Sequence, residues 1–168
     1  MKKLILLGRS ECGKTTLAQA LCGDVIAYQK TQYVKHEDII IDTPGEYAES
    51  TMFSSILSLY TYEASVVALL LSATERYSVY SPCFATRCNR PVIGIVTQID
   101  HPKAFPKRAH SWLELAGCHP IFHVSSYTGE GLWQILNYIR EPGDVLPWNS
   151  KEEMERPRTV LSDKYGEK

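Results

Sequence analysis

An eight-residue stretch near the N-terminus, residues 8–15, restricts the fold more tightly than any other part of the sequence. It reads Gly-Arg-Ser-Glu-Cys-Gly-Lys-Thr, which fits the pattern G-x-x-x-x-G-K-T. The apolar run of residues 3–7 precedes it and indicates a buried parallel strand. Residues 15–22 follow with the spacing of a helix that Gly23 would close. A loop of this pattern between a strand and a helix is typical of phosphate binding.

Backbone, helix and side chains of this stretch would each contribute to holding a polyphosphate. The glycines let the backbone wrap the phosphates with its N–H groups pointing inward, and the helix N-terminus adds the positive end of its dipole. Lys14 would reach the β- and γ-phosphates, and the Thr15 hydroxyl would ligate Mg²⁺. Lys14 is therefore a predicted catalytic residue as well as a predicted contact. The predicted nucleotide contacts here are Gly8, Arg9, Ser10, Glu11, Cys12, Gly13, Lys14, Thr15 and Thr16.

Short apolar runs alternate with amphipathic stretches along the rest of the chain. We expect further strands at 33–34, 39–41, 65–71, 92–96 and 121–124, and further helices at 51–61, 81–87, 107–116 and 131–139. A polar turn at 36–38 would join the first two of these strands. Trp112 and Leu115 would form the apolar face of the helix at 107–116, and Leu132, Ile135, Leu136 and Ile139 that of the helix at 131–139. This alternation predicts an α/β fold in three layers with a mostly parallel six-stranded sheet. With the phosphate loop after its first strand, the chain resembles a P-loop NTPase of the small-GTPase type. Residues 1–140 would form this domain. Residues 141–168, broken by prolines and rich in charge, would form a polar tail that is at most partly ordered.

A second motif, Asp42-Thr43-Pro44-Gly45, follows the expected strand at 39–41. An aspartate at a strand end can hold Mg²⁺ through a water, and the Gly45 N–H can reach a γ-phosphate. Alone the pattern is weak, since any strand can end in an Asp-Pro-Gly turn. Its place 28 residues after Lys14 makes it specific.

Two more loops are candidates for reading a base. Thr97-Gln98-Ile99-Asp100 follows the expected strand at 92–96. A carboxylate only accepts hydrogen bonds, so it suits guanine, which offers N1–H and an amino group on one edge. The alternative is that Asp100 caps the turn at His101-Pro102. The loop at 125–131 could offer backbone N–H groups to the guanine O6. The predicted base contacts are Thr97, Gln98, Asp100, Ser125, Ser126 and Tyr127.

In this order the four loops resemble the nucleotide-binding loops of the translation-factor-related GTPases. More narrowly, the chain resembles the EutP/PduV family of bacterial microcompartment operons, with the propanediol branch most similar. The resemblance covers residues 1–140 and rests on residues 8–16, Tyr-Gln-Lys-Thr-Gln at 28–32, Asp-Thr-Pro-Gly-Glu-Tyr at 42–47 and residues 89–97. It implies association with an encapsulated pathway for ethanolamine or propanediol. By analogy with switch regions, Thr31 would close on Mg²⁺ and the γ-phosphate; the alternative is a polar residue at a strand start.

The chain departs from the GTPase pattern at three places. Thr97-Gln98 replaces the usual Asn-Lys, so Gln98 can lie against the base but brings no cation. Glu46 stands where regulatory GTPases carry the glutamine that orients water, and would act there as a base or be repelled by the γ-phosphate. Glu11 places a second negative charge in the phosphate loop, facing either solvent or the nucleotide. Both glutamates predict slow turnover, with a solvated surface glutamate as the alternative for each. The predicted catalytic set is Lys14, Thr31 and Glu46.

Composition sets the limits on partners and compartment. The formal net charge is −1 and 22% of residues are charged, so nothing favours nucleic acid or a membrane surface. The apolar runs are far too short to span a bilayer, and no signal-peptide cleavage site follows the first one. Five cysteines without a C-x2-C pair fit small hydrophobic residues in a reducing cytoplasm. We expect no metal site among four histidines that would point apart: His101, His110, His119 and His123.

These observations leave three functions open. The first is a GTP-binding switch with slow hydrolysis, its cofactors GTP and Mg²⁺. The second is an ATP-dependent acetate kinase, because some members of the resembling family have been described so. The third is an interaction protein with residual nucleotide binding that docks on a microcompartment shell or cargo protein.

Overall fold

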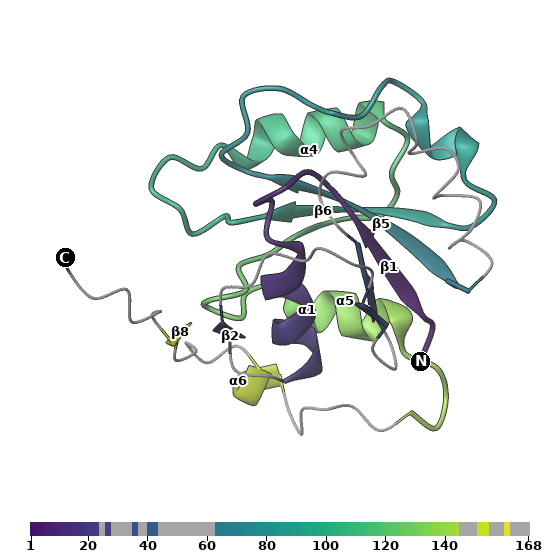
Figure 1. Ribbon diagram of the computed structural model, residues 1–168, viewed down its shortest axis with the longest axis vertical. Coiled ribbons are helices and arrows are strands. Elements are labelled where there is room, and N and C mark those ends of the chain that lie inside the picture. The colour runs from purple at the N-terminus through teal and green to yellow at the C-terminus, as the bar shows by residue number, and fades with distance from the viewer. Residues whose placement is uncertain are drawn as a thin grey trace.

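Six strands form one sheet at the centre of the computed structural model, which describes residues 1–23, 26–27, 35–36, 40–43, 63–144, 151–154 and 160–161 (Figure 1). Their spatial order is β3-β4-β1-β5-β6-β7. Five strands are parallel and β3 runs antiparallel to β4, which confirms the predicted mostly parallel α/β sheet. The strands are β1 (Leu4–Leu7), β3 (Lys35–His36), β4 (Ile40–Asp42), β5 (Val66–Ser72), β6 (Val92–Thr97) and β7 (Ile121–His123).

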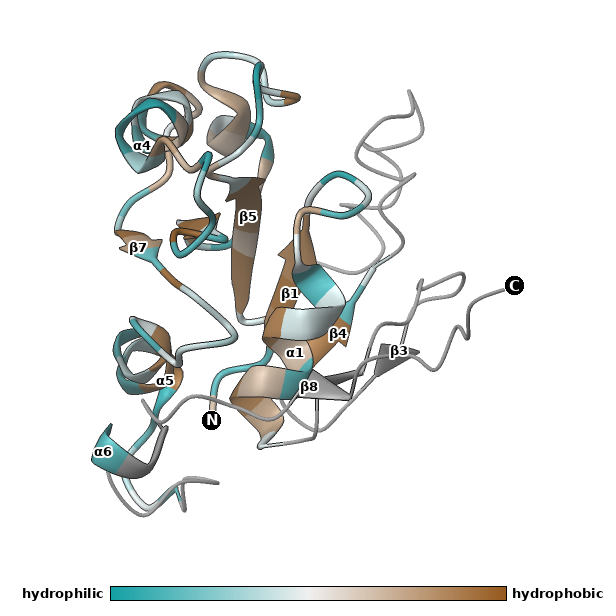
Figure 2. Cartoon of the chain, turned by 90° about the vertical axis from the view of Figure 1, so that its left-hand side faces the viewer, coloured by the Kyte–Doolittle hydropathy of each residue, from teal (hydrophilic) through white to brown (hydrophobic). Residues whose placement is uncertain are grey.

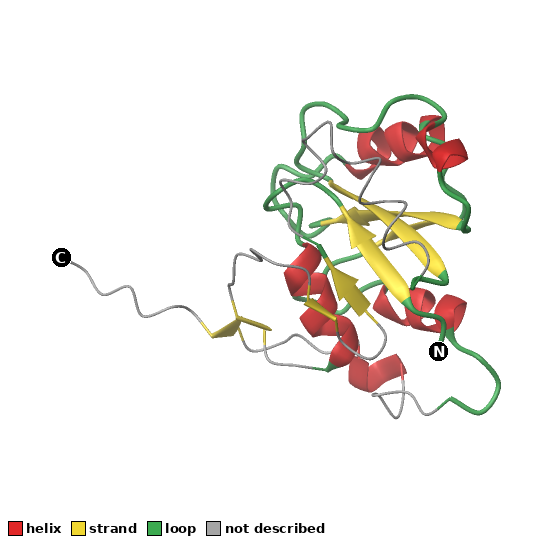
Figure 3. Cartoon of the chain, turned by 45° about the vertical axis from the view of Figure 1, so that its right-hand side comes forward, coloured by secondary structure: helices red, strands yellow, loops and turns green. Residues whose placement is uncertain are grey.

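Helices cover both faces of this sheet (Figure 3). One face carries α1 (Lys14–Cys22) and α5 (Leu132–Ile139), and the other carries α4 (Pro106–Leu115) and the 3-10 turn η1 (Phe84–Arg87). The packing of strand β1 explains why its sequence contains no polar residue. Leu4 and Leu6 pack in the core with α1 and α5, whereas Ile5 and Leu7 pack in the core on the α4 side. Because both faces are covered, the strand reads as a continuous apolar run. Strands β1 and β5 are accordingly brown in Figure 2.

Helix α5 buries the four residues that its spacing indicated, whereas α4 differs from expectation. Leu115 was expected on the apolar face of α4 but is 58% exposed, and the buried residues are Ala109 and Leu113. These two lie one helical turn apart and face the sheet, while Leu115 points to solvent from the last turn.

Other expected elements shift or shorten. The helix expected at 81–87 is only the turn η1, which begins after Pro82 and after Cys83 in the left-handed conformation (φ 56°). His36, expected in a turn, lies in β3 and pairs with Ile41 of β4. The strand expected at 33–34 and the helix expected at 51–61 lie outside the described residues.

The chain beyond α5 turns back onto the N-terminus. The Met1 amino group lies 2.7 Å from Asp144 Oδ2, and Lys2 N–H donates to Ile139 O (2.8 Å). Further along are α6 (Lys151–Met154) and β8 (Val160–Leu161), which pairs with β2 (Ile26–Ala27). The domain boundary at residue 140 stays a prediction. Among the described residues no helix has the length and apolar character needed to cross a membrane.

Candidate functional site

The 8–13 loop joins β1 to α1, as the sequence predicts (Figure 1). Gly13 is the N-cap of α1 with φ 91°, and Glu11 also has a positive φ of 64°. Gly8 lies so close to its surroundings that an added Cβ would stand 2.6 Å from Cys12 Sγ and 3.0 Å from Leu70 O. The loop therefore needs its glycines for two different reasons, a left-handed backbone at one end and close packing at the other.

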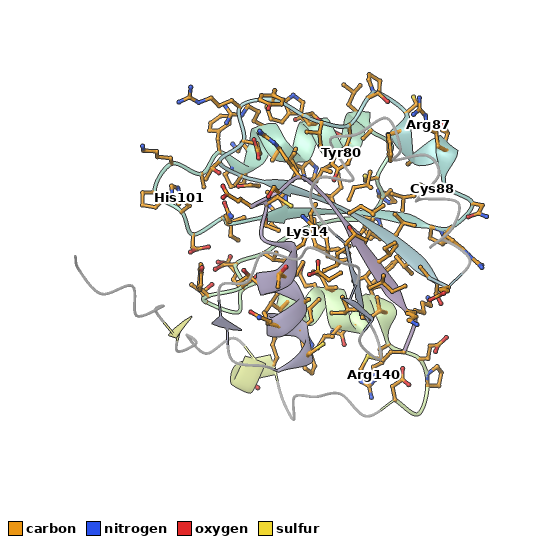
Figure 4. All side chains as sticks on the ribbon, viewed as in Figure 1. Lys14, Tyr80, Arg87, Cys88, His101 and Arg140 are labelled. Carbon is orange, nitrogen blue, oxygen red and sulfur yellow. The ribbon has the colours of Figure 1, made fainter. Side chains whose placement is uncertain are left out.

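Lys14 begins α1 and turns its side chain back into the loop (Figure 4). Its Nζ donates to Gly8 O at 2.9 Å and to Arg9 O at 2.8 Å, and the residue is 5% exposed. A buried ammonium group is costly unless charged or polar partners surround it. Held by two carbonyl oxygens beside a helix N-terminus, this cation makes the loop attractive to an anion.

Thr15 and Asp42 meet at the carboxyl ends of β1 and β4. Thr15 Oγ1 donates to Asp42 Oδ2 at 2.8 Å, and Asp42 is buried at the end of its strand. The sheet sets this contact, because Leu6 of β1 pairs in register with Asp42. A hydroxyl and a carboxylate oxygen this close fit the oxygen ligands that Mg²⁺ requires. The third predicted metal ligand, Thr31, lies outside the described residues, as do Gly45 and Glu46.

Thr97 and Gln98, at and just after the end of β6, both bond to the 8–13 loop. Thr97 Oγ1 donates to Cys12 O at 2.6 Å, and Gln98 Nε2 donates to Glu11 O at 3.0 Å. The Gln98 amide was expected to lie against a base. It instead bonds to the loop and to Ser72, whose Oγ donates to Gln98 Oε1 at 2.6 Å.

Ser72 is a residue that the sequence analysis missed. It is the last residue of β5, is 2% exposed, and pairs in register with Thr97. A signal was available, because Ser72 is the polar residue that ends the apolar run of β5, at the edge of the sheet where Asp42 and Thr97 also end their strands.

The predicted base contacts other than Ser125 line a narrow slot beside the start of α1, whereas Ser125 is fully buried. Within the 125–131 loop, Thr128 N–H donates to the buried Ser125 Oγ at 3.1 Å, while Tyr127 is 44% exposed. The slot holds about 30 Å³ and is lined by Gly13, Thr16, Thr97, Gln98, Asp100, Ser126 and Tyr127. The three loops that the sequence assigned to one ligand therefore meet in space.

A larger cavity of about 700 Å³ adjoins this slot, and the two share Gln98, Asp100 and Tyr127. Arg9 lines it from the 8–13 loop, where its guanidinium pairs with Glu75 Oε2 at 3.3 Å and lies 5.2 Å from the Tyr77 ring centre. The other lining residues are Ser10, Glu11, Ser72, Thr74, Glu75 and His101. Its volume falls within the range of about 300–1,000 Å³ that small-molecule sites occupy.

The histidine expectation is wrong for one pair. His110 Nδ1 and His123 Nε2 lie 2.9 Å apart, because α4 packs against β7 and brings the two rings together. Burial lowers the pKa of His123, and the neighbouring His110 lowers it further. Among the described residues, no group of three or more histidine, cysteine or carboxylate side chains could hold a metal ion.

The chain is similar to known proteins over most of its length. The family model PduV-EutP, "Ethanolamine utilisation - propanediol utilisation", matches residues 1–141. The "Propanediol utilization protein PduV" of Citrobacter freundii is 40% identical over 142 residues, or 83% of this chain and 93% of the relative. "Probable acetate kinase EutP" of Salmonella typhimurium and that of Escherichia coli are each 26% identical over 142 residues, covering 83% of this chain and 89% of the relative.

Among solved structures, the translation elongation factor SelB of Methanococcus maripaludis, in complex with the GTP analogue GppNHp, superposes with a TM-score of 0.55. The match covers 82% of this chain at 19% identity. The chain spans about a third of that protein, 32% of its length. At 19% identity, this similarity shows that the chain shares its fold with the matched part of SelB.

Proposed function

The chain belongs to the PduV–EutP family of ethanolamine and propanediol utilisation, and from that premise we propose that it binds GTP with Mg²⁺ and hydrolyses it slowly. The observation that carries the proposal is the meeting of three loops at one edge of the sheet. The 8–13 loop, the residues around Asp100 and the 125–131 loop come from separate parts of the chain and line two adjoining spaces. At the same edge Thr15 of α1 bonds to Asp42 at the end of β4. Open parallel α/β sheets bind their ligands at this carboxyl edge.

In this proposal Lys14 and the loop N–H groups hold the β- and γ-phosphates. Thr15 and Asp42 hold Mg²⁺, which would neutralise charge on the phosphate oxygens. Thr31 and Gly45 are proposed to close on the γ-phosphate, and Glu46 takes the place of the water-orienting glutamine. Slow hydrolysis follows from that carboxylate, because a negative group near the γ-phosphate is repelled by it.

Preference for guanine is proposed to rest on Asp100 and the 125–131 loop. Asp100 lines the slot beside the start of α1 together with Ser126 and Tyr127. A carboxylate in that slot can accept two hydrogen bonds from guanine and finds no matching pair of donors on adenine.

Titration calorimetry of GTP, GDP and ATP with Mg²⁺ tests the proposal. We expect tighter binding of GTP than of ATP in the unmodified protein. Asp100→Ala should abolish that preference while leaving triphosphate binding detectable. Lys14→Ala should weaken every nucleotide, with Lys107→Ala, an exposed lysine on α4, as the matched control. Equal affinities for GTP and ATP would contradict the guanine assignment, and no binding of either would contradict the whole proposal.

A second candidate is an ATP-dependent acetate kinase. The cavity of about 700 Å³ beside the 8–13 loop favours it, because phosphoryl transfer needs room for an acceptor. Arg9 also lines this cavity, where its guanidinium is paired with Glu75. The name of the EutP relatives points the same way. Formation of acetyl phosphate from ATP and acetate, lost in Lys14→Ala, would place this function above the first.

The cellular setting is proposed from the family. The protein would work in the cytoplasm in association with a propanediol-type microcompartment, with shell or cargo proteins as partners. Fluorescence microscopy in cells that form the compartment tests this, with Lys14→Ala and a chain lacking residues 141–168 as the two variants. Localisation lost only in the shortened chain would favour an interaction protein over a nucleotide-driven switch.

A further inference from the structure

Two consecutive side chains hold two consecutive carbonyl groups of the 8–13 loop. Thr97 bonds to Cys12 O at 2.6 Å and Gln98 bonds to Glu11 O at 3.0 Å. Each carbonyl shares a planar trans peptide group with the next N–H, which points the opposite way. Fixing these two oxygens therefore fixes the directions of the Cys12 and Gly13 N–H groups.

One of the two peptide groups adjoins a strained residue. Glu11 has a φ of 64°, a left-handed conformation that residues with a Cβ resist. The next residue but one, Gly13, also has a positive φ but adopts it without this penalty. The hydrogen bond from Gln98 to Glu11 O acts directly on the part of the loop that most needs external support.

The amide of Gln98 has its own orientation set by its neighbours. Its Nε2 must face Glu11 O, because a carbonyl can only accept, and its Oε1 accepts from Ser72 Oγ at 2.6 Å. Ser72 is itself held, since Thr74 N–H donates to its Oγ at 3.1 Å. A continuous line of hydrogen bonds thus runs from the end of β5 through Ser72 and Gln98 to the loop.

We propose that Ser72 and Gln98 are positioning residues that hold the 8–13 loop in the conformation needed for phosphate. Gln98 uses both ends of its amide in this contact and is not a base contact. The consequence for nucleotide affinity rests on the proposed function, whereas the effect on the loop does not require any ligand.

Hydrogen exchange of the ligand-free protein tests the effect on the loop directly. Gln98→Glu keeps the shape and the Ser72 contact but turns a carboxylate oxygen toward Glu11 O. We expect exchange in the peptide covering residues 9–14 to quicken by about tenfold, the factor that losing a typical hydrogen bond gives. Gln98→Lys keeps a donor for Glu11 O but offers no acceptor to Ser72, so exchange should quicken less than in Gln98→Glu. Exchange in β5 and β6 shows whether each variant is folded.

Two further variants separate positioning from a general loss of stability. Ser72→Ala should quicken exchange in the same peptide, and Ser72→Ala with Gln98→Leu should be no faster than Gln98→Leu alone, because both act through one amide. Ser78→Ala removes a hydroxyl from the same β5–η1 connection, bonded to Tyr80, and should leave the 8–13 loop unchanged. Unchanged loop exchange in Gln98→Glu, or additive effects of Ser72 and Gln98, would overturn the proposal.

Nucleotide binding gives a second, independent reading. Dissociation of fluorescent GDP should quicken about tenfold in Gln98→Glu, with the ratio of guanine to adenine affinity kept. A changed ratio with normal loop exchange would show a base contact and overturn the positioning role. If no nucleotide binds while loop exchange still responds to Gln98, the positioning role is supported and the proposed function fails.

Discussion

Gly131 cannot be replaced by a residue with a side chain without disturbing the fold, because its surroundings leave no space for one. It is the N-cap of α5, with φ 76°. A Cβ added there would lie 2.0 Å from His123 O and 3.1 Å from Val124 Cγ1. The first of these atoms is backbone of the strand that precedes the 125–131 loop, so it cannot turn aside as the end of a side chain could.

The cost of Gly131→Ala has two parts. A left-handed conformation costs a residue with a Cβ about 1–2 kcal/mol. Forcing an additional carbon into filled space typically costs about 1–3 kcal/mol. The sum predicts that the free energy of unfolding falls by about 2–5 kcal/mol. Because β7 and α5 must separate to admit the methyl group, the loop between them should move and nucleotide affinity should fall as well.

Gly143→Ala is the matched control. Gly143 has an even larger φ of 93°, but nothing lies within 4 Å of its added Cβ. This variant should therefore show only the conformational part, about 1–2 kcal/mol. Urea denaturation at pH 7.5, with the slope compared between proteins, measures both. Equal losses in the two variants, within about 0.5 kcal/mol, would refute the packing argument.

Three other variants follow from contacts already described. Gly8→Ala should lower both thermal stability and nucleotide affinity. Adding Cys12→Ala should restore part of each, because Cys12 Sγ is the atom nearest the new Cβ, at 2.6 Å. If calorimetry shows no recovery in the double variant, the clash with Cys12 is not the cause. Tyr80→Phe should cost about 1–2 kcal/mol in urea denaturation, because it removes a buried hydroxyl that lies 2.9 Å from both Leu7 O and Leu70 O and takes away their shared donor. The pKa of His123 is lowered in the folded state, so the unfolded chain takes up the proton first as pH falls, and the free energy of unfolding should decrease below about pH 6.5. His123→Gln should reduce the difference in unfolding free energy between pH 7.5 and pH 5.5. An unchanged difference would contradict this.

The strands of the sheet could be predicted from the sequence because of how they are buried. Strand β5 is seven residues covered on both faces, so its own letters carry the signal without reference to any partner. The turn from β1 into α1 is likewise local, since the glycines, Lys14 and the helix start lie within eight residues. Both features could be predicted because the physical cause and its effect occupy the same short segment.

What escaped prediction depends on distant residues. His110 and His123 meet only because α4 packs on β7, and Ser72 reaches Gln98 only because β5 and β6 pair in register. Leu115 was misplaced for a related reason: it lies on the side of α4 opposite Leu113, and helical spacing alone does not say which side the sheet covers. Contacts between side chains far apart in the sequence need the packing of whole elements, which periodicity along one segment does not contain.

Strand β1 limits where the protein can be redesigned. It is paired on both sides, by β4 and β5, and all four of its side chains are fully buried. Attempts to redirect ligand preference by changing residues 4–7 would disturb two layers at once. Asp100 and Tyr127 line the slot and are exposed, which makes them practical starting points for altering the proposed base preference.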